Sequence, residues 1–67
     1  MVDLKIECVS TQGSKVEWSY DTIMDFLDNI LDSSLIYTNV EATFFENRKE
    51  HFKTIKDLKI HCEEIVK

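Results

Sequence analysis

The residues with the richest coordination chemistry are two cysteines and two histidines: Cys8, Cys62, His51 and His61. A zinc site would need them at spacings such as CxxC or HxxxH, and neither spacing occurs in the chain. His61 and Cys62 are adjacent, so on a helix their side chains would point in different directions. Cys62 also belongs to an apolar stripe, where burial keeps a thiol protonated and makes it a weak nucleophile. We therefore expect no metal, no cofactor and no enzymatic activity, with both thiols in the core.

Four aspartates recur at helical spacing and are the second candidate for a functional site: Asp21, Asp25, Asp28 and Asp32. An EF-hand calcium loop needs a central glycine and a terminal glutamate, and this segment has neither. Aspartates on the back of a helix usually face water. The alternative interpretation of these aspartates, as a functional site, is a negatively charged docking surface that attracts a basic protein surface.

Charge is divided unevenly along the chain. Residues 16–47 carry seven acidic residues and no Lys or Arg, whereas residues 48–67 carry six basic residues and four acidic ones. The net charge of −5 disfavours direct binding to nucleic acid or to an anionic membrane, because both need Lys and Arg to replace counterions. An acidic surface can also imitate the phosphates of DNA, so a phage-type inhibitor that blocks a nucleic-acid-binding protein is the alternative function.

The chain is short, and its 67 residues predict one domain, residues 1–67, near the lower size limit for independent folding. A weak homodimer would stabilise so small a core, and both a monomer and a weak homodimer remain open. The opening segment "MVDLKIECV" has two acidic residues, and no apolar run approaches the length of about 18 residues that spans a membrane. Two cysteines without a dense disulfide pattern favour reduced thiols. We therefore expect a cytoplasmic protein.

The elements that must position these residues begin with a predicted β-hairpin. Residues 2–8 alternate between apolar and charged side chains with the period of two that is typical of a strand. The only glycine, Gly13, lies in the turn that follows, since glycine adopts a positive φ without steric cost. Val16, Trp18 and Tyr20 then alternate again and predict an antiparallel second strand.

The period then changes to that of a helix. Apolar residues recur at the i, i+3, i+4, i+7 and i+8 positions of one helix face: Ile23, Phe26, Leu27, Ile30 and Leu31. Asp21 is the predicted N-cap and the helix is expected to run to about Asp32. All four aspartates would then lie along its opposite face.

Two readings are open for residues 46–54, which follow a predicted strand over residues 35–45. They could extend the last helix, or they could form a hairpin. The segment "TIKD" that starts at Thr54 resembles a capping box with Asp in place of Glu, which favours a helix that begins there. We therefore predict a hairpin around residues 47–49, a short strand near residues 51–53, and a helix from Thr54. Its expected inward residues are Ile55, Leu58, Cys62 and Ile65.

The resulting order ββαββα predicts an α+β fold of two layers, an antiparallel sheet with two helices packed on one face. The other sheet face should be wet and charged, with these side chains: Lys5, Glu7, Lys15, Glu17, Glu41 and Thr43. Phe45 and Val9 are the apolar exceptions there, so a patch around Phe45 is a second candidate contact surface.

The segments "VEWSYDTIMDFLDNI", "VEATFFEN" and "TIKDLKIHC", in this order, carry a resemblance to known proteins. The chain is similar, over most of its length, to small uncharacterised domains of streptococci and related low-GC Gram-positive bacteria. The resemblance implies the ββαββα fold and a bacterial origin, and it implies no activity. The function that we expect from the residues above is that of a small non-enzymatic interaction module. Its expected contact surface is either the acidic helix face or the patch around Phe45.

Overall fold

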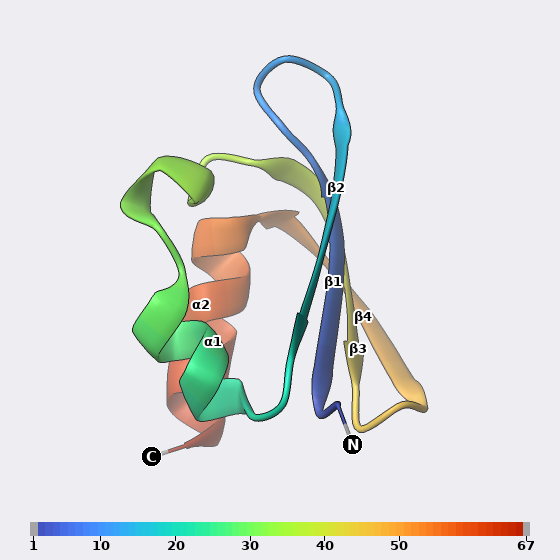
Figure 1. Cartoon of the computed structure of the whole chain (residues 1–67), viewed down its shortest axis with the longest axis vertical. Coiled ribbons are helices and arrows are strands. Elements are labelled where there is room, and N and C mark those ends of the chain that lie inside the picture. Colours follow the sequence, from blue (N-terminus) through green and yellow to red (C-terminus); the bar gives the residue numbers. More distant parts are fainter. Residues whose placement is uncertain (1, 67) are drawn as a thin grey trace.

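A computed structural model describes residues 2–66 as one four-stranded antiparallel sheet and two helices. The elements in chain order are β1 (Leu4–Val9), β2 (Lys15–Tyr20), α1 (Ile23–Asn29), the 3-10 turn η1 (Asp32–Ser34), β3 (Thr38–Phe44), β4 (Arg48–Thr54) and α2 (Ile55–Ile65). The strand order is β2-β1-β3-β4, and both helices lie on the same side of the sheet (Figure 1). The predicted α+β class, the ββαββα order and the two-layer arrangement are confirmed.

The first hairpin forms as its alternation predicts. Leu4, Ile6 and Cys8 of β1 are buried beneath the helices, and Ile6 lies opposite Trp18 of β2. Gly13 has a φ of 82° in the connecting turn, a left-handed conformation that other residues adopt at a cost. The hydroxyl of Ser10 accepts hydrogen bonds from two turn amides, those of Gln12 and Ser14, each at 3.3 Å.

The second hairpin decides between the two readings of residues 46–54. They form a turn and a strand, not an extension of the last helix, and β4 is longer than predicted, spanning Arg48–Thr54. The reversal comes earlier than residues 47–49 because buried Phe44 pairs with Arg48 across the ladder. Phe45 and Glu46 therefore take the positive φ values, 53° and 69°, that the turn requires.

Helix α1 is shorter than predicted at both ends. Its N-cap is Thr22, whose Oγ1 accepts the Asp25 amide at 3.1 Å, and not Asp21. Its last turn contains no basic residue, so nothing there balances the negative end of the helix dipole. The chain becomes extended at Ile30, and Leu31, which was expected to face the core, is 67% exposed.

Helix α2 begins where the capping pattern predicts. Thr54 is the N-cap, and its Oγ1 accepts the Asp57 amide at 3.3 Å. The helix covers a core that lies between the sheet and the two helices, with these buried apolar residues: Leu4, Ile6, Cys8, Ile23, Phe26, Val40, Ala42, Phe44, Ile55, Leu58 and Cys62. Ile65 was expected inside, but it ends the helix and is 39% exposed. Over residues 2–66, no helix has the length and apolar character needed to cross a membrane.

Candidate interaction surface

The four aspartates are all exposed, but they do not form the single row that a longer helix would have produced. Only Asp25 and Asp28 belong to α1, where their i, i+3 spacing puts them on neighbouring positions of one side. Asp21 precedes the N-cap, and Asp32 opens η1 after the helix has ended. The prediction of four aligned carboxylates is therefore wrong, because the helix that would align them stops at Asn29.

Phe45 lies in the turn between β3 and β4 and is 52% exposed, so it is at an end of the sheet instead of on its outer face. The backbone of Asp3 connects this turn to the start of the helical layer. Its carbonyl accepts the Phe45 amide at 2.8 Å, and its own amide donates to the Asp21 carbonyl at 3.2 Å. Two of the predicted candidate residues, Phe45 and Asp21, are thus each hydrogen-bonded through the backbone to Asp3, near the start of the chain.

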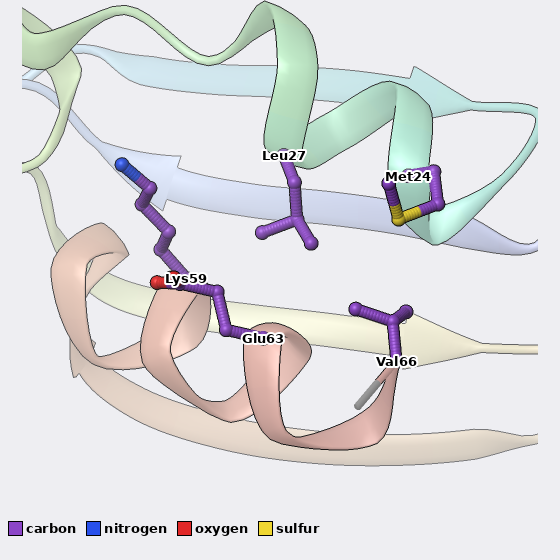
Figure 2. Close-up of a pocket in the computed structure, with 5 residues that line it drawn as sticks. All are labelled: Met24, Leu27, Lys59, Glu63 and Val66. Atoms are coloured by element: carbon purple, nitrogen blue, oxygen red, sulfur yellow. The ribbon is translucent and has the colours of Figure 1, made fainter.

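A groove of about 320 Å³, which the sequence pattern does not predict, opens between the two helices. Its lining residues come from both helices: Met24, Leu27, Lys59, Glu63 and Val66. Figure 2 shows Met24 and Leu27 on the side of α1 that faces α2, Val66 pointing up from the end of α2, and Lys59 extending from α2 at the other end of the groove, away from Met24. Met24 is 50% exposed and Val66 is 42% exposed, so apolar surface remains open to water here.

Two spacings in the sequence indicate the sides of the groove, but not the groove itself. Met24 and Leu27 are three residues apart, and Lys59, Glu63 and Val66 follow the i, i+4, i+7 pattern of one helix side. Each stripe lies beside the core-facing stripe of its helix. That these two stripes face one another depends on the way the helices pack, which the spacings do not contain.

The two sides of the groove differ in charge. Asp28 is four residues from Met24 and therefore borders the α1 side, and α1 contains no Lys or Arg. On the α2 side, Lys59 lines the groove, and exposed Lys56 lies one turn before it. Glu63 partly offsets these cations. The groove therefore has a purely acidic α1 margin and a mixed α2 margin with a small excess of positive charge.

The outer face of the sheet is charged, as the alternation of the strands predicts, and the strand register adds an arrangement that the sequence alone does not reveal. Glu17, Glu7, Glu41 and His51 are successive cross-strand partners and form one line across all four strands. His51 Nε2 lies 3.0 Å from Glu41 Oε2, and Lys49 Nζ lies 3.7 Å from Glu41 Oε1. These side chains lie on a solvated face. The glutamates among them, Glu17, Glu7 and Glu41, put like charges directly opposite one another on neighbouring strands.

The thiols have the core positions that their sequence context predicts. Cys8 and Cys62 are free and buried. Burial raises the pKa of the Cys8 thiol, and burial together with the nearby Glu50 carboxylate raises the pKa of Cys62 to about 12. Both thiols are thus protonated at neutral pH. Within residues 2–66, no three His, Cys, Asp or Glu side chains are grouped so that they could hold a metal ion.

Two surfaces thus combine exposed apolar and acidic residues. The first is the groove with its acidic α1 margin, and the second is the end of the molecule at Phe45 and Asp21. Neither a protein-family model, nor a curated protein, nor a solved structure matches the chain.

Proposed function

We propose that this protein is a small non-enzymatic interaction module that binds a basic protein surface through the exposed side of α1. The observation that carries the proposal is the groove between the helices, where the apolar wall of Met24 and Leu27 adjoins Asp28. A suitable partner places apolar side chains in the groove and Lys or Arg against the α1 aspartates. Charge complementarity of this kind chiefly gives orientation and a fast association rate.

The α1 side is preferred to the Phe45 end because it combines an apolar groove with two carboxylates on one regular element. Phe45 is a single exposed ring on a turn, and one aromatic side chain supplies little area by itself. The Phe45 end remains a separate contact surface in the test below. The DNA-mimic alternative needs carboxylates spaced along one line like phosphates, and α1 aligns only Asp25 and Asp28.

The resemblance to domains of Gram-positive bacteria supports a bacterial cytoplasm as the setting, and such a lysate is the source for the test. The protein is immobilised, incubated with the lysate and eluted with an NaCl gradient. We expect a basic protein to be retained at low salt and released as salt screens the aspartates. The Asp25→Asn/Asp28→Asn variant should retain much less of it.

The matched control is Glu7→Gln/Glu17→Gln, which removes the same charge from the outer sheet face and should leave retention unchanged. Retention that is indifferent to NaCl and to the loss of both aspartates would refute the proposal. Loss of retention in Phe45→Ala, with the aspartate variant unaffected, would instead place the contact at the Phe45 end of the molecule.

A further inference from the structure

We infer that the open edge of β2 binds an extended basic segment of a partner protein, which joins the sheet antiparallel to β2 as an added strand. Recognition of this kind draws affinity from main-chain hydrogen bonds and specificity from side chains beside the edge. The edge is a second contact surface, independent of the one in the proposed function.

The backbone of β2 has hydrogen-bonding groups that meet no neighbouring strand. β2 is an end strand in the order β2-β1-β3-β4, and among residues 2–66 only β1 pairs with it. Figure 1 shows β2 in front of β1, with no other element crossing it. The Ser10 amide donates to the Ser14 carbonyl at 2.8 Å, and bonded pairs alternate along an antiparallel ladder, so the even-numbered residues of β2 bond to β1. The amides and carbonyls that point to the open edge belong to Lys15, Glu17 and Ser19.

The helix-facing side chains of β2 are only partly covered. The β1 side chains opposite them are buried, whereas those of β2 are intermediate in exposure: Val16, Trp18 and Tyr20. Trp18 stacks on Tyr37 with 5.9 Å between the ring centroids, so the chain itself covers part of the indole. A strand added beside β2 would place apolar side chains against these residues and remove their remaining apolar surface from water.

The side of α1 that lies over the β2 edge bears Asp25. α1 packs on β2, whereas α2 packs on β3 and β4, so the side of α1 away from α2 is the side of the β2 edge. Met24 and Leu27 lie on the opposite side, which faces α2 (Figure 2). At 3.6 residues per turn, Asp25 is turned about 100° from Met24 and about 160° from Leu27. The exposed Asp25 carboxylate is therefore directed away from the groove.

The charge beside the edge is negative in balance. The acidic side chains on β2, on the neighbouring β1 and at the start of α1 are those of Glu7, Glu17, Asp21 and Asp25. Two lysines offset part of this charge: Lys5 and Lys15. The excess of carboxylates favours a partner strand that carries Lys or Arg, especially opposite Glu17, because cross-strand pairs of opposite charge are stabilising.

A second copy of the chain suits this edge less well than a basic segment does. Two β2 strands paired by two-fold symmetry would put both α1 helices on one face of the joined sheet, with their Asp25 sides toward each other. Like charges would then oppose the pairing. The β4 edge carries Arg48, Lys49 and Lys53, and basic residues on an edge strand discourage the addition of a strand there.

The probe for the edge is an end-capped peptide of alternating valine and lysine, as long as β2, and its control has glutamate in place of lysine. Trp18 is the only tryptophan, so its fluorescence reports binding at the edge. We expect the lysine peptide to bind, less tightly at high NaCl, and the glutamate peptide to bind at least about tenfold more weakly. Hydrogen exchange should show new protection at the Glu17 and Ser19 amides, and little change at the Trp18 amide.

Backbone methylation of the peptide tests strand pairing without a change of charge. In the antiparallel register the lysines lie on the outer sheet face opposite Glu17 and direct their amides at β2, whereas the valine amides point to solvent. Methylation of the lysine amides should therefore weaken binding at least about tenfold. Methylation of the valine amides should leave binding unchanged.

A protein variant tests the same hydrogen bonds from the other side. Ser19→Pro removes one outward amide, and proline is tolerated on edge strands. It should weaken binding of the lysine peptide at least about tenfold, whereas Ser19→Ala keeps the amide and should bind as the wild type does. Circular dichroism establishes that Ser19→Pro is folded, and the methylated peptides test the pairing on the wild-type protein in either case.

Several results would overturn the inference. One is that the lysine peptide does not bind, and another is that it binds as well with methylated lysine amides, or without protection of Glu17 and Ser19. Self-association of the free protein in sedimentation equilibrium, abolished by Ser19→Pro, would assign the edge to a second copy instead. Ser19→Pro leaves α1 unaltered, so the retention of a basic protein through the α1 aspartates should not change. The edge and the α1 surface can thus fail separately.

Discussion

His61 Nε2 lies 3.3 Å from Glu50 Oε2, and both atoms are shielded from solvent where α2 packs on β4. The two atoms do not have the geometry of a hydrogen bond, and neither has another hydrogen-bond partner among residues 2–66. Arg48 Nε approaches the same Glu50 oxygen at 3.7 Å. The rings of Phe44 and Phe52 lie 5.7 and 5.3 Å from the His61 ring. This cluster joins the last helix to an edge strand beside the buried Cys62.

The stability of the fold should depend on pH in the alkaline range through Cys62. Burial and the Glu50 carboxylate raise its pKa from 9.0 to about 12 in the folded protein. A group whose pKa is raised by folding stabilises the protein fully below its unfolded pKa, and the contribution is lost as the pH rises. The urea midpoint should therefore fall between pH 9 and about 12.

Cys62→Ala separates this effect from other alkaline titrations, since burial also raises the pKa values of Cys8 and Tyr20. The variant should be less stable at pH 7, because it leaves a small cavity, yet it should lose less stability between pH 9 and 12. Urea unfolding at pH 7, 9, 10 and 11 measures both effects. An equal loss in wild type and variant would contradict the assignment to Cys62.

Replacement of Glu46 by glycine should stabilise the protein. Glu46 has a φ of 69° in the second hairpin turn, and a side chain in the left-handed region costs about 1 kcal/mol or more. We expect Glu46→Gly to raise the free energy of unfolding by about 0.5 to 1 kcal/mol, after allowance for the greater flexibility of glycine when unfolded. Asn47→Gly is the control, since Asn47 has no positive φ, and it should give no gain.

Loss of the N-cap at Thr54 should weaken α2. The Thr54 hydroxyl accepts the Asp57 amide, and removal of such a cap costs about 1 kcal/mol. Thr54→Ala should lower the free energy of unfolding by that amount, whereas Thr54→Ser keeps the acceptor and should lose much less. Chemical denaturation followed by circular dichroism measures the difference. Equal losses in both variants would mean that the methyl group, and not the hydroxyl, is what matters.

Neutralising the central glutamate of the outer sheet face should also stabilise the fold. Glu7 lies between Glu17 and Glu41 in the strand register, so its carboxylate has a like charge on each side. Glu7→Gln should add about 0.2 to 1 kcal/mol to the free energy of unfolding at low salt, and less at high salt. Glu64→Gln, on an exposed part of α2, removes the same charge without relieving such repulsion. A loss of stability in Glu7→Gln at low salt would show that Glu7 makes a favourable contact instead.

The parts of the fold that could be predicted are those that local patterns determine. The alternation in β1 and β2, and the capping pattern that starts α2 after Thr54, depend on residues close together in the chain. The end of α1 was predicted wrongly because Leu31 continues the apolar period although the helix has already stopped. Periodicity shows which side chains are apolar. It does not show whether the core extends far enough along the helix to bury them.

The sequence by itself determined the class of the protein: the order of its elements, its charged outer sheet face, its two buried thiols and the acidic character of α1. Only the tertiary structure decided that the second hairpin turns at Phe45 and Glu46, that Glu7 has a carboxylate on each side, and that Met24 faces Val66 across a groove. The reason is physical. Alternation and capping act over a few residues, whereas strand register and helix packing bring together residues far apart in the chain, and a single sequence contains no record of those distances.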